Sequence, residues 1–374
     1  MHTSLKIATI WGIPIRLHWT FVLVLGWLLY LGIPSRHLFQ GGRAFWLFIS
    51  VFSVFFCILM HELGHAFMAK RYGVRTLQIM LSPIGGQAIL ERMPKQPMKE
   101  LMVALAGPLV NIFLGLLATP FLWLVPPQQL AHLPHFILNP NGNTFLRLAD
   151  DERFIIGFVV LNFLVAIFNL LPAFPLDGGR ILRSLLSLRM NKLGATRIAT
   201  FLGQGFAGVI VVFSLSNYNW LMAVIGLFIF ISASMEYRYV KLDSRLHAFS
   251  GKDILRARFT KLCLHDPLSE VLKSWKEGSE KNFLVFDQEQ TLKGVLTSPT
   301  LMENKEKGAG RIVEELTSSH YEKVSSSDRL VDIIRVMQEN DYEIIPVYEE
   351  GELVGVVDWN DVEHFIRIQK EQIG

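Results

Sequence analysis

Long apolar runs separated by short polar links fill the chain up to about Glu236. After that point charged residues become frequent, and no run reaches the roughly 20 apolar residues that a helix needs to cross a bilayer. The pattern predicts a polytopic α-helical membrane domain over residues 1–240, a linker at 241–250 and a soluble α+β domain over 251–374. The six predicted spans are 18–34, 45–69, 101–125, 154–174, 199–216 and 219–235.

Positive charges predict the orientation of these spans, because short cytoplasmic loops carry an excess of Lys and Arg. The links between spans two and three and between spans four and five are rich in both residues, whereas the link between spans five and six has no charge. Six spans with both termini in the cytoplasm fit this alternation. We therefore expect a multi-pass protein of the cell membrane whose soluble domain is cytoplasmic.

Composition supports the membrane assignment. Hydrophobic residues make up 51% of the chain and charged residues only 18%, where about a quarter would be charged in an ordinary soluble protein. The two cysteines, Cys57 and Cys263, lie in different predicted domains, so no disulfide framework is expected. We expect membrane lipid around the spans and no nucleic-acid partner.

The polar link at residues 71–91 has a pattern of its own. Apolar residues alternate around Leu77, Ile79 and Leu81, and Gly85-Gly86 follows before a second short apolar stretch. This pattern predicts a β-hairpin at the membrane surface, with a plain surface loop as the alternative. A hairpin there would have an open edge, and open edges accept extended peptides.

The stretch H61-E-L-G-H65 places ionisable residues at the end of an apolar span. Residues four apart share a helix face, so His61 and His65 can both point at one ion, and imidazole suits zinc. Glu62 can then take a proton from a water at the metal. Ionisable groups inside a span are usually functional. The alternative is a pair of hydrogen-bonded histidines at the membrane interface.

A catalytic zinc site needs a third protein ligand. Spans two and four both run inward, which places Asp177 at the same cytoplasmic side as the histidines, after two prolines that break the helix. We predict Asp177 as the ligand, although a helix-terminus or salt-bridge role remains open. Cys57, one turn before His61, is an alternative ligand. The acids Glu91 and Glu100 lie in the basic link and are expected to be solvated.

Together, H61-E-L-G-H65, A106-G-P-L-V-N111 and N169-L-L-P-A-F-P-L-D-G-G-R180 resemble the site-2 protease family of intramembrane zinc metalloproteases. The resemblance implies one zinc ion per chain held by His61, His65 and Asp177, with Glu62 as the general base. It also suggests that Asn169 steadies the oxyanion or positions the peptide, with a helix-packing hydrogen bond as the alternative. Asn111 is expected to be structural.

A weak internal repeat in residues 251–374 resembles a tandem pair of CBS domains, over about 251–303 and 312–370. Each copy reads helix, strand, turn, strand, helix. The resemblance suggests an adenine nucleotide as ligand, with Thr297 and Asp361 as contacts, and a homodimer formed through the pair. Each copy carries only half of the usual hydroxyl and carboxylate pattern. Simple helix capping therefore remains the alternative.

These features predict an intramembrane zinc endopeptidase that cleaves transmembrane segments of membrane-protein substrates near the cytoplasmic face and is regulated through its CBS pair. The same histidines and aspartate would also serve a CBS-regulated metal transporter or sensor, which would not need Glu62. A catalytically dead membrane protein that only binds substrate is a third interpretation.

Overall fold

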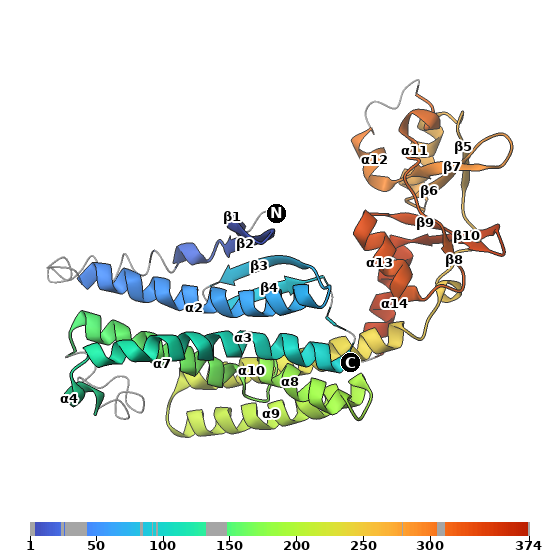
Figure 1. Cartoon of the computed structure of the whole chain (residues 1–374). Helices are drawn as coiled ribbons and strands as arrows, with labels where there is room; N and C mark the ends of the chain where they lie inside the picture. Colours follow the sequence, from blue (N-terminus) through green and yellow to red (C-terminus); the bar gives the residue numbers. More distant parts are fainter. Residues whose placement is uncertain are drawn as a thin grey trace. The chain divides into compact units, whose positions relative to one another are not determined.

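The computed structural model describes residues 4–23, 26, 43–82, 85–91, 93–94, 96–131, 148–278, 280–304 and 311–372. The chain divides into two compact units, Met1–Tyr237 and Arg238–Gly374. Figure 1 labels the elements of both.

Helices dominate the first unit. The longer ones are α2 (Arg43–Arg71), α3 (Pro97–Ala118), α7 (Asp150–Asn169), α8 (Asp177–Ser187), α9 (Lys192–Ser216) and α10 (Trp220–Leu246). A 3₁₀ turn at Thr119–Leu124 and the short α4 (Pro127–Leu130) follow α3.

Among the described residues, four helical segments are long and apolar enough to cross a membrane. They are Phe48–Arg71, Pro97–Leu124, Lys192–Ser216 and Trp220–Leu246. These segments coincide with the second, third, fifth and sixth predicted spans. The first predicted span, 18–34, lies largely outside the described residues, and the fourth, 154–174, falls on α7. Six spans therefore remain a prediction, and four apolar helices are observed.

A four-stranded sheet accompanies the helices of the first unit. Its strands are β1 (Ser4–Ile10), β2 (Ile13–His18), β3 (Thr76–Ser82) and β4 (Gly85–Leu90), in the order β1-β2-β3-β4. The β2–β3 pair is parallel and the other two pairs are antiparallel. The sequence did not lead us to expect β1 and β2, which precede the first predicted span.

The sheet packs on one face of α2 (Figure 1). Its buried core joins Leu63 and Ala66 of α2 to Ile79 and Leu81 of β3. Leu77, in contrast, is 48% exposed, because a bulge between Thr76 and Gln78 interrupts the alternation of the strand. The antiparallel β3–β4 pair occupies residues of the predicted hairpin, whose position at a membrane surface stays a prediction.

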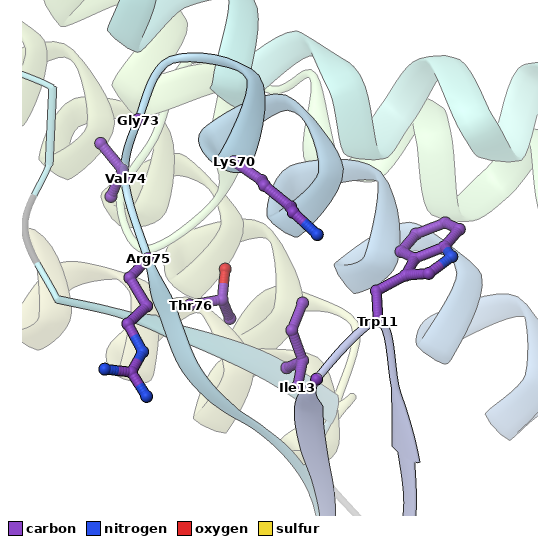
Figure 2. A pocket seen from close by; sticks show the side chains of 8 residues that line it. Trp11, Ile13, Lys70, Gly73, Val74, Arg75 and Thr76 are labelled. Carbon is purple, nitrogen blue, oxygen red and sulfur yellow. The ribbon is translucent and has the colours of Figure 1, made fainter.

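A hollow of about 410 Å³ lies where the last turn of α2 meets the β1–β2 turn. Figure 2 shows Lys70 extending toward Trp11 across it, with Arg75 and Thr76 on the other side. None of the residues predicted to bind metal lines this hollow. It is therefore separate from the site described below.

A buried ion-pair network ties α8 to two other helices. The guanidinium of Arg183, only 2% exposed, bonds Glu100 of α3 and Glu236 of α10. The expectation that Glu100 is solvated is therefore wrong. A carboxylate in a basic link is buried here because Arg183 provides its counter-charge, and removing either partner of such a pair typically costs about 3–5 kcal/mol.

The second unit contains two similar halves. Strands β5 (Lys261–Cys263), β6 (Phe283–Phe286) and β7 (Leu292–Leu296) form one sheet, and β8 (Val324–Ser325), β9 (Ile344–Glu349) and β10 (Glu352–Asp358) form the other. Each sheet has one parallel and one antiparallel pair. The accompanying helices are α11 (Leu268–Glu277), α12 (Ser298–Glu303), α13 (Leu330–Asn340) and α14 (Trp359–Glu371).

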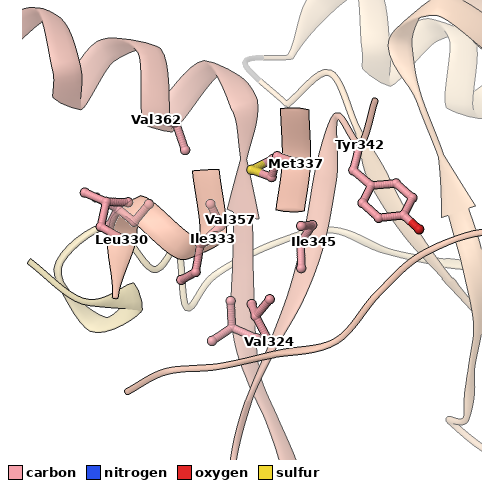
Figure 3. Close-up of a cluster of buried hydrophobic side chains, with 10 residues drawn as sticks. Val324, Leu330, Ile333, Met337, Tyr342, Ile345, Val357 and Val362 are labelled. Atoms are coloured by element: carbon pink, nitrogen blue, oxygen red, sulfur yellow. The ribbon is translucent and has the colours of Figure 1, made fainter. Parts of the chain in front are cut away.

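Each half has its own hydrophobic core. Figure 3 shows the core of the second half, where Leu330, Ile333 and Met337 of α13 pack against Ile345 and Val357 of the sheet. A further cluster, which includes side chains from both sheets, joins the halves. The repeat predicted from the sequence therefore corresponds to two βαββα units, each with its own core, that contact one another through this further cluster.

Candidate metal centre

Two helices bring three potential ligand atoms together. His61 and His65 lie one turn apart on α2, and Asp177 is the first residue of α8. The Asp177 Oδ2 atom lies 3.0 Å from His61 Nε2 and 3.1 Å from His65 Nε2, and the two Nε2 atoms are 3.1 Å apart. The three residues are only 5–7% exposed. Among the His, Cys, Asp and Glu side chains that the structure describes, these three are close enough together to hold one metal ion.

The turn before α8 positions Asp177 beside the two histidines. Helix α7 ends at Asn169, and Pro172 and Pro175 prevent it from continuing. Gly178 then packs so closely on this turn that a Cβ there would lie 2.1 Å from the carbonyl oxygen of Leu171. Glycine is required at that position, because a larger residue would push the start of α8, and Asp177 with it, away from α2.

Hydrogen bonds from α3 orient both imidazoles. His65 Nδ1 lies 2.7 Å from the carbonyl oxygen of Val103, and His61 Nδ1 lies 2.7 Å from Asn111 Oδ1. A carbonyl oxygen only accepts hydrogen bonds, so Nδ1 of each ring carries the proton. Each Nε2 then presents a lone pair toward Asp177. Partners of this kind are typical of metal-binding histidines, because they hold the tautomer and the ring direction.

Asn111 is itself held by a second asparagine. Its Nδ2 donates to Asn162 Oδ1 at 3.1 Å, and Asn162 Nδ2 donates to Phe158 O at 2.9 Å and to Cys57 Sγ at 3.2 Å. Asn111, Asn162 and Cys57 are all fully buried. Cys57 therefore belongs to this hydrogen-bond chain and not to the group of three ligand atoms.

Asn111 makes the structural helix-packing hydrogen bonds that were expected, to Asn162 of α7 and Cys57 of α2, and its amide oxygen also contacts His61 directly. We did not predict Asn162 at all. One signal was available in the sequence, because Asn162 is the single polar residue in an otherwise apolar run from Phe154 to Phe168. An amide there needs a buried partner.

We expect Asn111→Leu to weaken zinc binding by about 10–100-fold, as measured by competition with a coloured chelator. Leucine has a similar volume but leaves the His61 Nδ1–H without an acceptor. Asn111→Asp keeps an acceptor oxygen and should retain most of the affinity. Asn217→Leu, at an exposed helix end, is the matched control. An unchanged affinity in Asn111→Leu would show that the hydrogen bond to His61 is dispensable.

Helix α3 passes against the Nε2 side of the imidazoles. At Gly107 a Cβ would lie 2.3 Å from His65 Nε2 and 2.7 Å from His61 Nε2. At Gly64 of α2 a Cβ would lie 2.8 Å from the Ala106 carbonyl oxygen. These two glycines let α2 and α3 approach closely, and at Gly107 α3 places no side chain against the Nε2 atoms. The donor set, its tautomers and the glycine at this position all fit a zinc ion.

Glu62 points toward the sheet. Its Oε2 accepts a 2.7 Å hydrogen bond from the backbone N–H of Ala88 in β4, and the residue is 9% exposed. A Cβ at Gly86 would lie 2.7 Å from Glu62 Cγ. Strand β4 therefore covers Glu62 from the side opposite the helix.

Asn169 is not brought into the group of ligand atoms. Its Nδ2 donates to the carbonyl oxygen of Val165, one turn back on α7, at 3.0 Å. This bond is made within α7, and both the oxyanion role and the helix-packing hydrogen bond stay predictions for Asn169. An oxyanion role for Asn169 would require its amide to leave Val165.

In the second unit, Thr297 and Asp361 lie at the starts of α12 and α14. The Thr297 hydroxyl bonds that of Thr300 at 3.1 Å, and the Asp361 carboxylate lies 3.6 Å from Arg256. Burial raises the pKa of Asp361 above the ordinary carboxyl value, and Arg256 opposes the rise. Capping also takes place here, because Asp358 accepts from the Asn360 N–H.

A buried asparagine that the sequence analysis missed joins these two helix starts. Asn282 accepts a hydrogen bond from the Ser298 N–H at 2.8 Å and donates to Asp358 Oδ2 at 2.9 Å. Asn282 and Asp358 are 2% and 1% exposed. The α12 and α14 termini therefore face a common polar region.

Comparison with known proteins decides the family. The sequence model of peptidase family M50 matches residues 49–215. A curated relative, zinc metalloprotease MJ0392 of Methanocaldococcus jannaschii, is 35% identical over 255 residues, which cover 68% of this chain and 67% of the relative. The chain belongs to peptidase family M50, the site-2 protease family. As a member it is an intramembrane zinc metalloprotease, and the expected zinc cofactor and enzyme class are confirmed.

Further matches include a relative that covers nearly the whole chain, a domain model in the second unit and a solved structure. A putative zinc metalloprotease of Synechocystis, sll0528, is 25% identical over 379 residues and covers 96% of this M50 chain and 94% of its own. The CBS domain model matches residues 313–367. The solved structure titled Site-2 Protease from Methanocaldococcus jannaschii aligns with 33% identity and a TM-score of 0.41, over 63% of this chain and 95% of that one.

Proposed function

We propose that His61, His65 and Asp177 hold the zinc ion of this M50 protease and that Glu62 is its general base. One observation carries the proposal. Two imidazole Nε2 atoms and a carboxylate oxygen lie within 3.1 Å of one another, although 112 and 116 residues separate Asp177 from the histidines. Burying three ionisable groups is costly unless they bind a metal or pair with one another.

Zinc, when bound, acts as a Lewis acid on the scissile carbonyl and lowers the pKa of a nearby water. Glu62 follows His61 directly, so its carboxylate can take a proton from the attacking water. It then delivers the proton to the leaving amine, as a general base that becomes a general acid. The three ligands stay fixed during this transfer, because α3 and the turn before α8 hold them.

We further propose that the substrate is a transmembrane protein cut near the cytoplasmic face of the cell membrane. Six spans with both termini in the cytoplasm would place the end of α2, with His61 and His65, near that face. Support comes from the four apolar helices and from Lys70 and Arg71 in the last turn of α2. Lipid would surround the apolar helices.

A helical substrate hides its carbonyl groups in hydrogen bonds, so it must be extended before cleavage. We propose that β4 binds the extended segment, because it is the edge strand of the β1-β2-β3-β4 sheet and lies beside Glu62. Pairing with an edge strand uses main-chain hydrogen bonds and places few demands on sequence.

The ligand set is tested by zinc content. We expect Asp177→Ala to fall well below one zinc per purified chain, because two ligands do not complete a catalytic zinc site. Cys57→Ala should keep a full zinc ion, since Cys57 Sγ only accepts a hydrogen bond from Asn162. Metal analysis of both variants, with thermal unfolding as a check on folding, gives the answer. Zinc lost only in Cys57→Ala would refute the assignment.

We propose that residues 251–374, in copies at about 251–303 and 312–370, form a regulatory CBS pair that binds an adenine nucleotide and mediates a homodimer. The matching βαββα halves and the polar region between the starts of α12 and α14 support this proposal. The boundary at 240 and the linker at 241–250 are part of it.

Thr297 and Asp361 are the proposed nucleotide contacts. We expect ATP or AMP to raise the melting temperature of the full chain and Thr297→Val to reduce that shift by half or more. The measurement is differential scanning fluorimetry. If neither nucleotide shifts the melting temperature, the nucleotide-binding proposal is wrong and helix capping is the role of these residues.

A further inference from the structure

Strand β4 has one unpaired side in the part of the sheet that the structure describes. It is the last strand in the order β1-β2-β3-β4, and only β3 pairs with it there. In an antiparallel pair, backbone groups alternate between the partner strand and the opposite side. The Ala88 N–H points at Glu62 of α2, so it belongs to the side away from β3.

Glu62 occupies this unpaired side. Its Oε2 is 2.7 Å from the Ala88 nitrogen, a position in which the carbonyl oxygen of an added strand would accept the same proton. The face of β4 that packs on α2 is also tight two residues earlier. A Cβ at Gly86 would lie 2.7 Å from Glu62 Cγ and 2.7 Å from Ile58 Cγ2, so α2 lies directly against this face of the strand and holds the Glu62 side chain beside the edge.

We infer that the Ala88–Glu62 hydrogen bond is a self-blocking contact, which an extended substrate strand replaces when it pairs with β4. The substrate carbonyl takes the Ala88 N–H, and Glu62 is released toward its role as a base. This inference rests on the proposed docking of substrate at β4 and goes beyond it. The same amide that holds the general base in the free enzyme becomes a substrate-binding donor.

Two chemical features favour such an exchange. A hydrogen bond from a backbone amide to a carboxylate is among the stronger kinds, so it holds the closed arrangement firmly. An incoming strand supplies a replacement acceptor, so the Ala88 N–H is never left buried without a partner, which would be costly. The free carboxylate, in turn, gains a proton donor in the attacking water.

The test compares two variants that both lack the base. Glu62→Gln keeps an amide oxygen that can accept from Ala88, whereas Glu62→Ala cannot. The probe is a fluorescein-labelled hexapeptide of alternating valine and threonine, titrated by anisotropy into the full-length, zinc-loaded protein in nanodiscs. We expect Glu62→Ala to bind it at least about fivefold more tightly than Glu62→Gln, because no hydrogen bond has to be displaced.

Substitutions in β4 show whether the amide is responsible. Ala88→Pro removes the N–H on the unpaired side, where an edge strand tolerates proline, and should abolish the difference between the two Glu62 variants. Ala88→Gly keeps the N–H and should preserve the difference. Equal binding by the two Glu62 variants, or a difference that survives Ala88→Pro, would overturn the inference.

Two further measurements separate this inference from the docking proposal. A peptide N-methylated at every residue has no N–H on either edge and cannot form the alternating hydrogen bonds of an added strand, so equal binding of that peptide would refute edge-strand docking and the exchange with it. Amide hydrogen exchange without peptide tests the Ala88–Glu62 hydrogen bond independently of peptide binding. The Ala88 amide should exchange faster in Glu62→Ala than in Glu62→Gln, and equal rates would refute the self-blocking contact even if peptide docks at β4.

Discussion

Glu62→Gln should lower the rate of substrate cleavage by about 10²–10⁴-fold while leaving one zinc per chain. Glutamine has the shape of glutamate and can accept the Ala88 hydrogen bond through its amide oxygen, so β4 and the three ligands should stay in place. It cannot take a proton from water at neutral pH. The loss would therefore report proton transfer and not a collapsed site.

The measurement is cleavage of a co-reconstituted transmembrane substrate in liposomes, together with metal analysis of the same preparation. Glu91→Gln is the matched control, because it removes the same charge from an exposed residue just after β4. That variant should cleave at the wild-type rate. Wild-type cleavage by Glu62→Gln would contradict the proposed base, and zinc loss in that variant would assign Glu62 a role in metal binding.

Gly107→Ala should strip zinc from the protein although it adds only one methyl group. That methyl would lie 2.3 Å from His65 Nε2 and 2.7 Å from His61 Nε2, closer than van der Waals contact allows. Either the imidazoles rotate away from Asp177 or α3 moves off α2. Both responses separate the ligand atoms, so we expect at least a tenfold loss of zinc affinity and a matching loss of cleavage.

Gly157→Ala on α7 is the matched control, because a Cβ there meets nothing within 4 Å. Alanine is favoured over glycine inside a helix by about 0.8–1 kcal/mol, so this control should be as stable as the wild type or more so. Zinc content and cleavage should both be unchanged in it. Full zinc occupancy in Gly107→Ala would mean that the space beside the imidazoles is larger than the geometry indicates.

Some elements followed from sequence patterns because they depend on local periodicity. The apolar runs corresponded to four long helices, and the repeated pattern of residues 251–374 corresponded to two βαββα halves. Other elements depended on partners distant in the chain. The β1–β2 pair completes a sheet through parallel pairing with β3, and no local signal announces a partner more than 50 residues away.

Buried charge was the weakest part of the sequence analysis. Glu100 appeared to be one more solvated residue of a basic link, yet it is 4% exposed against Arg183. A charged residue has the same local pattern whether it faces water or a buried counter-charge. Only the packing of α3, α8 and α10 distinguishes the two cases.

The sequence by itself predicted the residues of the candidate site: two histidines four residues apart, the glutamate between them and the aspartate after two helix-breaking prolines. Helical periodicity and the chemistry of these side chains are enough for that prediction. Tertiary structure alone decided which atoms converge, that Asn111 and Asn162 orient His61, and that Glu62 is held by Ala88. These are contacts across 26 to 116 residues of chain, made by helix packing and strand pairing that short-range patterns do not encode.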